Sequence, residues 1–522
     1  MQHSRHRRTR SVFLLAGLLA TATTVDIDAR RQGTALTGTR LAGVRVGPYS
    51  VGFALRTGLD ETRRINILDA GTRIGVATWY PAQDAGDRPR MTSLDYRLLE
   101  LGRVPTDAEK TRYADAEADA AVGWRHVGIV PLSKAQARAS LASGGIAVRD
   151  ATRVPGTFPL VMILGGQYYL ASTAEALASH GFFVAAPFRF SDQSNEIGTS
   201  DFTWYLENSV RDAEWALNDL RGSASGADVT RLGALGHGGG GMQALLFAMR
   251  QRGVSALVNI DAGNFSSRTN ARAIPFYSPR LLRAPYLYVA TPETRKGQDR
   301  FDDFLAMTFS DRIEAVLDEP TVRHHDLSDL GRAVTAPLGI RGEAQEPVQH
   351  AYAAVQDLVV RFLDDHLRKL TPGGGAPTEW AAGERTDGFR ITARAGSAPA
   401  PTPAAVIASL GAETASSLRA AWRRDPEAAV FQPEALARII GRALDTRRYD
   451  AAEAISEVAV EIRAESAILH ELRSDALEAR GALGKAAEAA AACAGTPGAN
   501  DWRTEAAAAR CRIRLERLRV PR

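Results

Sequence analysis

The stretch from Arg231 to Arg250, RLGALGHGGGGMQALLFAMR, has the pattern of a turn that positions a nucleophile, yet its centre carries none. An apolar strand precedes the turn and an amphipathic helix follows it. Gly236 and Gly240 flank the turn, and Gly238 stands between them. A nucleophile elbow holds its central residue in a strained conformation, so that the side chain projects above a sheet. Glycine adopts such backbone angles freely but brings no reactive atom.

Other residues near the turn offer few substitutes. No Ser, Thr, Cys or Asp lies between Gly236 and Gly241. His237 precedes the central position, and we expect its side chain to point away from the site. Ser266 and Ser267 follow on a later loop and remain alternative nucleophiles. A water molecule activated by a histidine is a further alternative.

The elements around this turn alternate between strand and helix, which predicts a doubly wound, mostly parallel sheet. Sheets of this kind carry their sites at the carboxyl ends of the strands. The expected strands are FPLVMILGG, FFVAAPF, VSALVNIDA and APYLYVAT, and the expected helices are STAEALASHG, 201–221 and 347–368.

This organisation resembles the α/β-hydrolase fold over about residues 46–370, and in particular the group that contains dienelactone-hydrolase-like proteins and platelet-activating-factor acetylhydrolases. The residues that carry the resemblance are GPYSVGF, ATWYPA, FPLVMILGG, ASHGFFVAAPF and the elbow turn. The resemblance implies carboxylic-ester hydrolysis by a serine, an acid and a histidine, in that chain order. In this chain Gly238 leaves the nucleophile position vacant.

Two residues compete for the place of the acid. Asp261 ends the strand ALVNID, where the acetylhydrolase-like members keep theirs, and Glu293 follows the strand YLYVAT, where most other α/β hydrolases keep theirs. We favour Asp261 because NIDAGN has the small-residue turn that such an acid needs. A turn or helix-capping aspartate is the other interpretation of Asp261.

The stretch VRHHDLSDLG offers two histidines for the base. The family pattern places an apolar residue three positions after the histidine and an aspartate five positions after it. His324 fits this pattern with Leu327 and Asp329, whereas His325 would put Ser328 in the apolar position. The resemblance therefore implies that His324 is the base.

An oxyanion hole would use two backbone N–H groups, those of Gly239 and Gln167. The family often has His-Gly in the loop before Gln167, and this chain has Gly165 and Gly166 instead. Because the hole needs only backbone donors, this departure leaves it possible.

The remaining segments suggest a second domain. Residues 83–155 are polar and rich in alanine, and we expect an insertion or lid with helical stretches. The Gly/Pro/Ala-rich composition of residues 371–404 predicts a linker. Residues 405–522 are helical, with RRYDAA (447–452) and GALGKA (481–486) 34 positions apart. This period is typical of tetratricopeptide repeats, and an unrelated helical bundle is the alternative.

Residues 1–22 have the form of a secretory signal peptide, with basic MQHSRHRRTR, apolar SVFLLAGLLA and Ala20-Thr21-Ala22. We therefore expect export to the periplasm or the cell exterior, with no membrane span in the mature chain; an uncleaved anchor is the alternative. The formal net charge is +4, and residues 1–22 contain four arginines and no acid. The mature chain is thus near neutral, which argues against nucleic-acid binding.

The cysteines and the absence of other motifs limit which bonds and cofactors we expect in this chain. Cys493 and Cys511 are the two cysteines; they either form a disulfide or remain buried thiols. The sequence holds no metal-ligand cluster, phosphate-binding loop or dinucleotide fingerprint, so we expect no cofactor and no metal.

Three functions follow from these observations. The first is a degenerate exported hydrolase whose pocket still binds a small ester-like or lipid-like ligand. The second is a working esterase, with another nucleophile or altered from a serine parent. The third is a non-catalytic interaction protein that binds a protein partner through residues 405–522.

Overall fold

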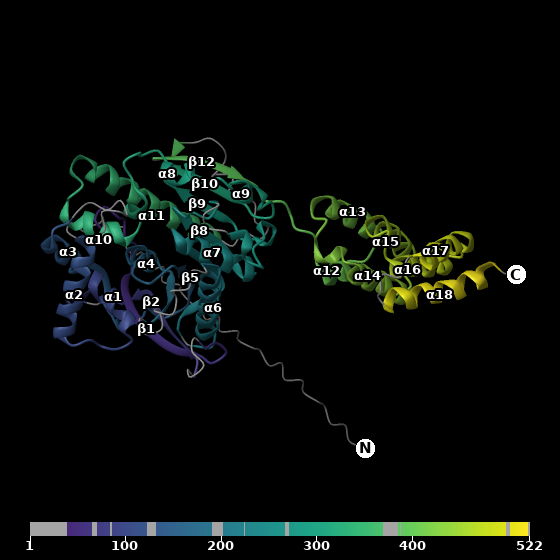
Figure 1. Ribbon diagram of the computed structural model, residues 1–522, viewed down its shortest axis with the longest axis horizontal. Coiled ribbons are helices and arrows are strands. Elements are labelled where there is room, and N and C mark those ends of the chain that lie inside the picture. Colours follow the sequence, from purple (N-terminus) through teal and green to yellow (C-terminus); the bar gives the residue numbers. More distant parts are fainter. Residues whose placement is uncertain are drawn as a thin grey trace, which may run out of the picture. The chain divides into compact units, whose positions relative to one another are not determined.

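The computed structural model describes residues 39–64, 70–83, 86–122, 132–190, 202–223, 225–266, 271–368, 385–386, 388–496 and 502–519 (Figure 1). These residues form two compact units: the first extends to Arg394 without Thr308–Ser310, and the second comprises Thr308–Ser310 and the residues from Ala395 onwards. Residues 1–22, where the signal peptide is expected, lie outside the described residues.

The first unit contains one sheet with the strand order β11-β12-β10-β9-β8-β7-β5-β6-β2-β1-β4-β3. Its strands are β1 (Ser50–Asp60), β2 (Thr72–Ala82), β3 (Arg90–Thr92), β4 (Gly144–Arg149), β5 (Phe158–Leu164), β6 (Phe183–Arg189), β7 (Ala227–His237), β8 (Val254–Ile260), β9 (Tyr286–Ala290), β10 (Arg312–Leu317), β11 (Arg385–Thr386) and β12 (Phe389–Arg394). From β6 to β10 the neighbouring strands are parallel. Antiparallel pairs extend the sheet from β6 to β2 and from β10 to β12. The doubly wound, mostly parallel sheet is confirmed.

Helices cover both faces of this sheet. They are α1 (Ser93–Leu98), α2 (Asp107–Val122), α3 (Lys134–Leu141), α4 (Ala171–Ser179), α6 (Phe202–Arg221), α7 (Gly239–Arg250), α8 (Pro292–Lys296), α9 (Asp302–Ala306), α10 (Asp329–Leu338) and α11 (Gln345–Leu367). Strand β5, FPLVMIL, shows why both faces must be covered. Val161 and Ile163 pack in one core with α4 and α11, whereas Leu160 and Met162 pack in the other with α6 and α7. A strand buried on both faces is apolar throughout.

Two segments differ from the sequence-based predictions. Part of the predicted linker 371–404 belongs to the sheet, because β12 pairs with β10 from Arg312 opposite Arg394 to Leu317 opposite Phe389. The segment 83–155 is also more than a lid. It includes the helices α1, α2 and α3, but its strand β4 pairs in parallel with β1 and so forms part of the main sheet.

The second unit is helical. Its helices are α12 (Pro403–Ala408), α13 (Thr414–Arg424), α14 (Pro433–Asp445), α15 (Tyr449–Ile462), α16 (Ala467–Ala479), α17 (Leu483–Gly495) and α18 (Trp502–Arg519). The turns between α14 and α15 and between α16 and α17 match in their backbones. Arg447 and Gly481 both have positive φ, 56° and 77°, and the residue after each donates its N–H to a carbonyl five positions earlier.

A disulfide joins Cys493 of α17 to Cys511 of α18, which resolves the two alternatives left open by the sequence. In neither unit is a described helix both long enough and apolar enough to cross a membrane.

Candidate active site

Strand β7 passes into helix α7 through a single residue, Gly238, with φ 55° and ψ −124°. Its N–H donates to the Ile260 carbonyl of the neighbouring strand at 3.2 Å, and its carbonyl accepts from Gly241 at 3.1 Å. Positive φ is costly for residues with a Cβ and free for glycine. The turn therefore has the backbone conformation of a nucleophile elbow, which glycine adopts without strain, and lacks the side chain that usually occupies it.

Close packing explains the other glycines of the turn. A Cβ on Gly236 would lie 2.1 Å from the Gly240 carbonyl oxygen, and a Cβ on Gly240 would lie 2.3 Å from the Leu164 carbonyl oxygen. A Cβ on Gly165 would lie 2.6 Å from the Cα of Gly240. Strand, helix and the loop after β5 thus meet backbone to backbone. A Cβ on Gly239 would meet nothing within 4 Å, so packing does not require glycine there.

His324 stands over the vacant position. A Cβ on Gly238 would lie 3.0 Å from both Nε2 and Cε1 of the His324 ring. The ring belongs to the 3₁₀ turn η7 (His324–Leu327), and its side chain is 39% exposed. The imidazole therefore reaches the place where an elbow side chain would begin, and it is open enough to move slightly.

Asp261 forms a hydrogen bond with the other ring nitrogen of His324. Its Oδ2 lies 2.8 Å from Nδ1 of His324. Asp261 is fully buried directly after β8 and has positive φ, 47°. Its Oδ1 accepts the N–H of Thr291 at 2.6 Å, and its Oδ2 also accepts the hydroxyl of Thr294 at 2.9 Å. The sequence analysis did not identify these two threonines.

These contacts set the charge of the carboxylate. Burial acts to raise the pKa of Asp261, but the hydrogen bond and charge of His324 and the N–H of Thr291 together bring that pKa below its ordinary value. An ionised Asp261 favours the imidazole tautomer with its proton on Nδ1, which leaves Nε2 as a proton acceptor on the side of Gly238. Asp261 and His324 thus have the geometry in which a carboxylate orients an imidazole.

The competing acid lies elsewhere. Glu293 has a side chain that is 73% exposed, and it pairs with Arg323 at 3.6 Å. Of the two carboxylates that the sequence offered, the structure brings Asp261 to the imidazole.

His237 departs from expectation, because its ring does not point away from the site. It stacks on the His324 ring with centroids 4.3 Å apart, and its Nε2 donates to the His324 carbonyl at 3.0 Å. The turn at Gly238 and the 3₁₀ turn η7 bring these two histidines together. Burial, and then the charge of His324, lower the pKa of His237 to about 3. The neutral His237 ring therefore packs against the His324 ring and also forms a hydrogen bond with the His324 backbone.

His325 does not contact Asp261 through a hydrogen bond, and its ring meets that of His324 edge to face at 4.9 Å. Burial, followed by the charge of His324, lowers the pKa of His325 to about 4. His325 is thus a neutral neighbour of the His324 ring.

The predicted oxyanion segments also meet at this site. Gly165 and Gly166 have φ values of 103° and 107°, which favour glycine. Gln167 follows them with its side chain buried; its Nε2 donates to Glu100 at 3.2 Å. The packing of Gly165 against Gly240 brings this loop to the start of α7. The roles of the Gly239 and Gln167 N–H groups remain predictions.

Asp329 joins the histidine turn to the loop after β5. Its N–H donates to the Tyr169 carbonyl at 2.8 Å, and its carboxylate accepts the N–H of Ser172 at 2.7 Å and also the Ser172 hydroxyl. Arg40 lies 3.7 Å from the same carboxylate. The aspartate of the predicted histidine pattern therefore fastens two loops of the site to each other.

No described hydroxyl or thiol takes the missing place. Within the described ranges, the His324 side chain has one hydrogen-bond partner, Asp261. Ser266 is thus not bonded to His324, and Ser267 lies outside the described residues. The described residues also contain no cluster of three or more His, Cys, Asp or Glu suited to a metal ion.

No family model matches this sequence, and no curated protein matches it. Among solved structures, the chain is similar to a ferulic acid esterase from Streptomyces cinnamoneus, with 19% identity and a TM-score of 0.43. The similarity covers 64% of this chain and 95% of that one. The first unit is thus a mixed α/β fold with mostly parallel strands and flanking helices, and the second unit is helical.

Proposed function

We propose that the first unit descends from serine ester hydrolases, keeps their acid–base pair and binds a small ester-like ligand, but hydrolyses it feebly or not at all. The observation that carries this proposal is the relation among three residues. His324 reaches 3.0 Å from the Cβ position of Gly238 and 2.8 Å from Asp261. A hydroxyl on residue 238 would complete this arrangement, and none is present.

The chemistry left to the site uses water. Water oxygen would attack the ester carbonyl carbon while His324 Nε2 accepts the water proton, and the Gly239 and Gln167 N–H groups would stabilise the oxyanion. The carbon–oxygen bond to the alcohol would then break as His324 returns the proton to the leaving oxygen. Loss of the serine from a triad costs about a millionfold in turnover, and leaves on the order of 10³ over the uncatalysed reaction.

The test is hydrolysis of p-nitrophenyl acetate by the unmodified chain, together with labelling by a serine-directed phosphonate. We expect trace hydrolysis, lowered further by His324→Ala, and no labelling. Strong hydrolysis that His324→Ala abolishes would reveal another nucleophile and establish the working esterase as the function.

A second function is proposed for the helical unit, in which it docks a protein partner. Helix α18 exposes Trp502 and Ile513, at 72% and 70%. These residues are eleven positions apart, about three helical turns, so they share one face. A photo-crosslinking residue at Trp502 in the native cell should capture one partner. Crosslinks at Trp502 no more specific than those from the control position Arg519 would reject this function.

We also propose that the chain is exported and that residues 1–22 are removed. The Cys493–Cys511 disulfide supports this proposal, since disulfides persist in oxidising compartments. Mass spectrometry of the native protein should find an N-terminus near Thr23. An intact Met1 on the soluble protein would contradict export by this route.

A further inference from the structure

A cavity of about 270 Å³ opens beside the loop Gly165–Gln167. Arg189, at the end of β6, and Gln243, on α7, both line it. In the sheet, the order β8, β7, β5, β6 places Asp261, Gly238, this loop and Arg189 at successive strand ends. None of Gly238, Asp261 and His324 lines the cavity. The cavity therefore does not contain the acid–base pair but adjoins it through this loop.

Gln243 brings an unused amide to this cavity. The residue is only 3% exposed, and within the described part of the chain its side chain makes no hydrogen bond. Neither amide atom of Gln243 is among the fully buried side-chain atoms that lack a partner, so the amide keeps some access to solvent. Gln243 thus offers both a donor and an acceptor to whatever fills the cavity.

Arg189 is a second polar group with unused capacity. Its Nε and Nη2 donate to Asp212 at 2.9 and 3.3 Å, and its side chain is 8% exposed. Its Nη1 has no hydrogen-bond partner among the described residues. Asp212 holds the guanidinium in place, so that the remaining N–H groups form a fixed donor.

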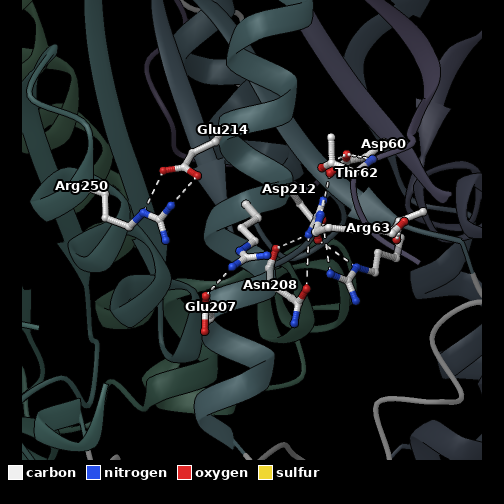
Figure 2. Close-up of polar contacts among 11 residues, drawn as sticks. Asp60, Thr62, Arg63, Glu207, Asn208, Asp212, Glu214 and Arg250 are labelled. Atoms are coloured by element: carbon white, nitrogen blue, oxygen red, sulfur yellow. Dashed lines mark hydrogen bonds and ion pairs between the residues drawn. The ribbon is translucent and has the colours of Figure 1, made fainter. Parts of the chain in front are cut away.

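The charges at this wall balance. Asp212 also accepts from Arg63 at 2.7 Å, and Arg63 donates to Asp60 at 2.6 Å (Figure 2). Two guanidinium groups thus alternate with two carboxylates. Glu100 lines the cavity too, where burial raises its pKa against the opposing hydrogen bond from Gln167. An anionic ligand would find no unbalanced cation here, and a cationic ligand would face Arg189.

The other walls are aromatic. Tyr168 and Tyr169 stack with centroids 4.4 Å apart, and Phe188 and Tyr205 add two further rings. The volume is at the small end for ligand sites, which suits a compact molecule better than a long acyl chain. Flat apolar groups pack well against such rings.

We propose that this cavity binds a compact, uncharged, ring-containing molecule, with its ring against the aromatic side chains and its carbonyl or hydroxyl group on Arg189 and Gln243. This inference rests on the proposed function in one respect: the ester-like ligand of the first unit would be one that carries such a ring. It excludes long-chain lipids from this cavity.

The experiment is ligand-detected NMR on the full chain with three probes: benzamide, benzoate and decanoate. We expect benzamide to bind, benzoate to bind at least tenfold more weakly because of its charge, and decanoate not to bind. Gln243→Leu should weaken benzamide binding about tenfold. The control Gln349→Leu, on α11 outside the cavity, should leave binding unchanged.

Three results would overturn the proposal: no benzamide binding, tighter binding of benzoate or decanoate, or equal binding by Gln243→Leu. The assay measures binding without turnover. Failure of the hydrolase proposal alone would therefore leave benzamide binding intact. If a Gly238→Ser variant hydrolysed esters but benzamide did not bind, the ligand proposed for the cavity would be wrong and the hydrolase proposal would stand.

Discussion

The Nε2 atom of His324 lies 3.0 Å from the point that a Cβ on Gly238 would occupy, and Nδ1 of the same ring lies 2.8 Å from Asp261. The imidazole is thus held at one end and faces an empty place at the other. A Cβ contact of 3.0 Å is tighter than usual, so a side chain at residue 238 requires the ring to move by a few tenths of an ångström. Because the ring is 39% exposed, it can do so.

The positive φ of Gly238 predicts different effects of alanine at two adjacent glycines. Gly238→Ala should lower the free energy of unfolding by about 1–3 kcal/mol, because φ is 55° there. Gly239→Ala is the matched control: its Cβ meets nothing within 4 Å, and residue 239 is the first residue of α7, so alanine there should leave the free energy of unfolding unchanged or raise it slightly. Urea unfolding of both variants measures this difference. Equal effects would contradict the strain at residue 238.

The stacked histidine predicts a pH dependence of stability. The pKa of His237 falls to about 3 in the folded chain, against an ordinary value of about 6.5. Between these values the unfolded chain binds a proton that the folded chain does not, so the free energy of unfolding decreases as pH falls. The contribution of His237 to the free energy of unfolding is therefore fully present above about pH 6.5, and it is lost progressively as the pH falls towards 3.

His237→Gln should flatten this decline in urea unfolding between pH 7 and pH 5, while a smaller slope remains from His325, whose pKa is about 4. An unchanged slope in the variant would show that His237 does not stay neutral in the folded chain.

The disulfide predicts a local loss of stability in the helical unit. Cys493 and Cys511 are 18 positions apart, and closing a loop of this length stabilises by about 3 kcal/mol. The double variant Cys493→Ser and Cys511→Ser should therefore lose amide-exchange protection in α17 and α18. The sheet of the first unit serves as the internal control. Unchanged protection in both helices would show that the bond contributes nothing to their stability.

The sequence predicted the sheet because its apolar strands and regular helices carry their own periodicity. It failed for β12, FRITAR, because Gly/Pro/Ala-rich stretches on both sides suggested a linker, while the pairing with β10 is a long-range contact. It likewise treated β4 as part of a lid. Local composition does not show whether a short segment pairs with a strand that is distant in the sequence.

The candidate site shows the same limit. Glycine spacing predicted the elbow, and the histidine pattern pointed to His324. The small-residue turn NIDAGN favoured Asp261 over Glu293, but both residues follow strands, and the fold shows which of them lies at the imidazole. The stacking of His237 was missed because strand alternation does not continue through a turn with positive φ.

The most direct test of the central claim is Gly238→Ser, measured by labelling with a serine-directed phosphonate and by hydrolysis of p-nitrophenyl acetate. The hydroxyl would stand beneath His324, so labelling should appear at residue 238 and turnover should rise by several orders of magnitude, up to about a millionfold. Gly239→Ser is the control: it adds a hydroxyl in open space and should neither label nor gain activity. Adding His324→Ala to Gly238→Ser should remove the gain. A folded Gly238→Ser protein with neither labelling nor increased turnover would contradict the claim that the acid–base pair is intact and lacks only its nucleophile.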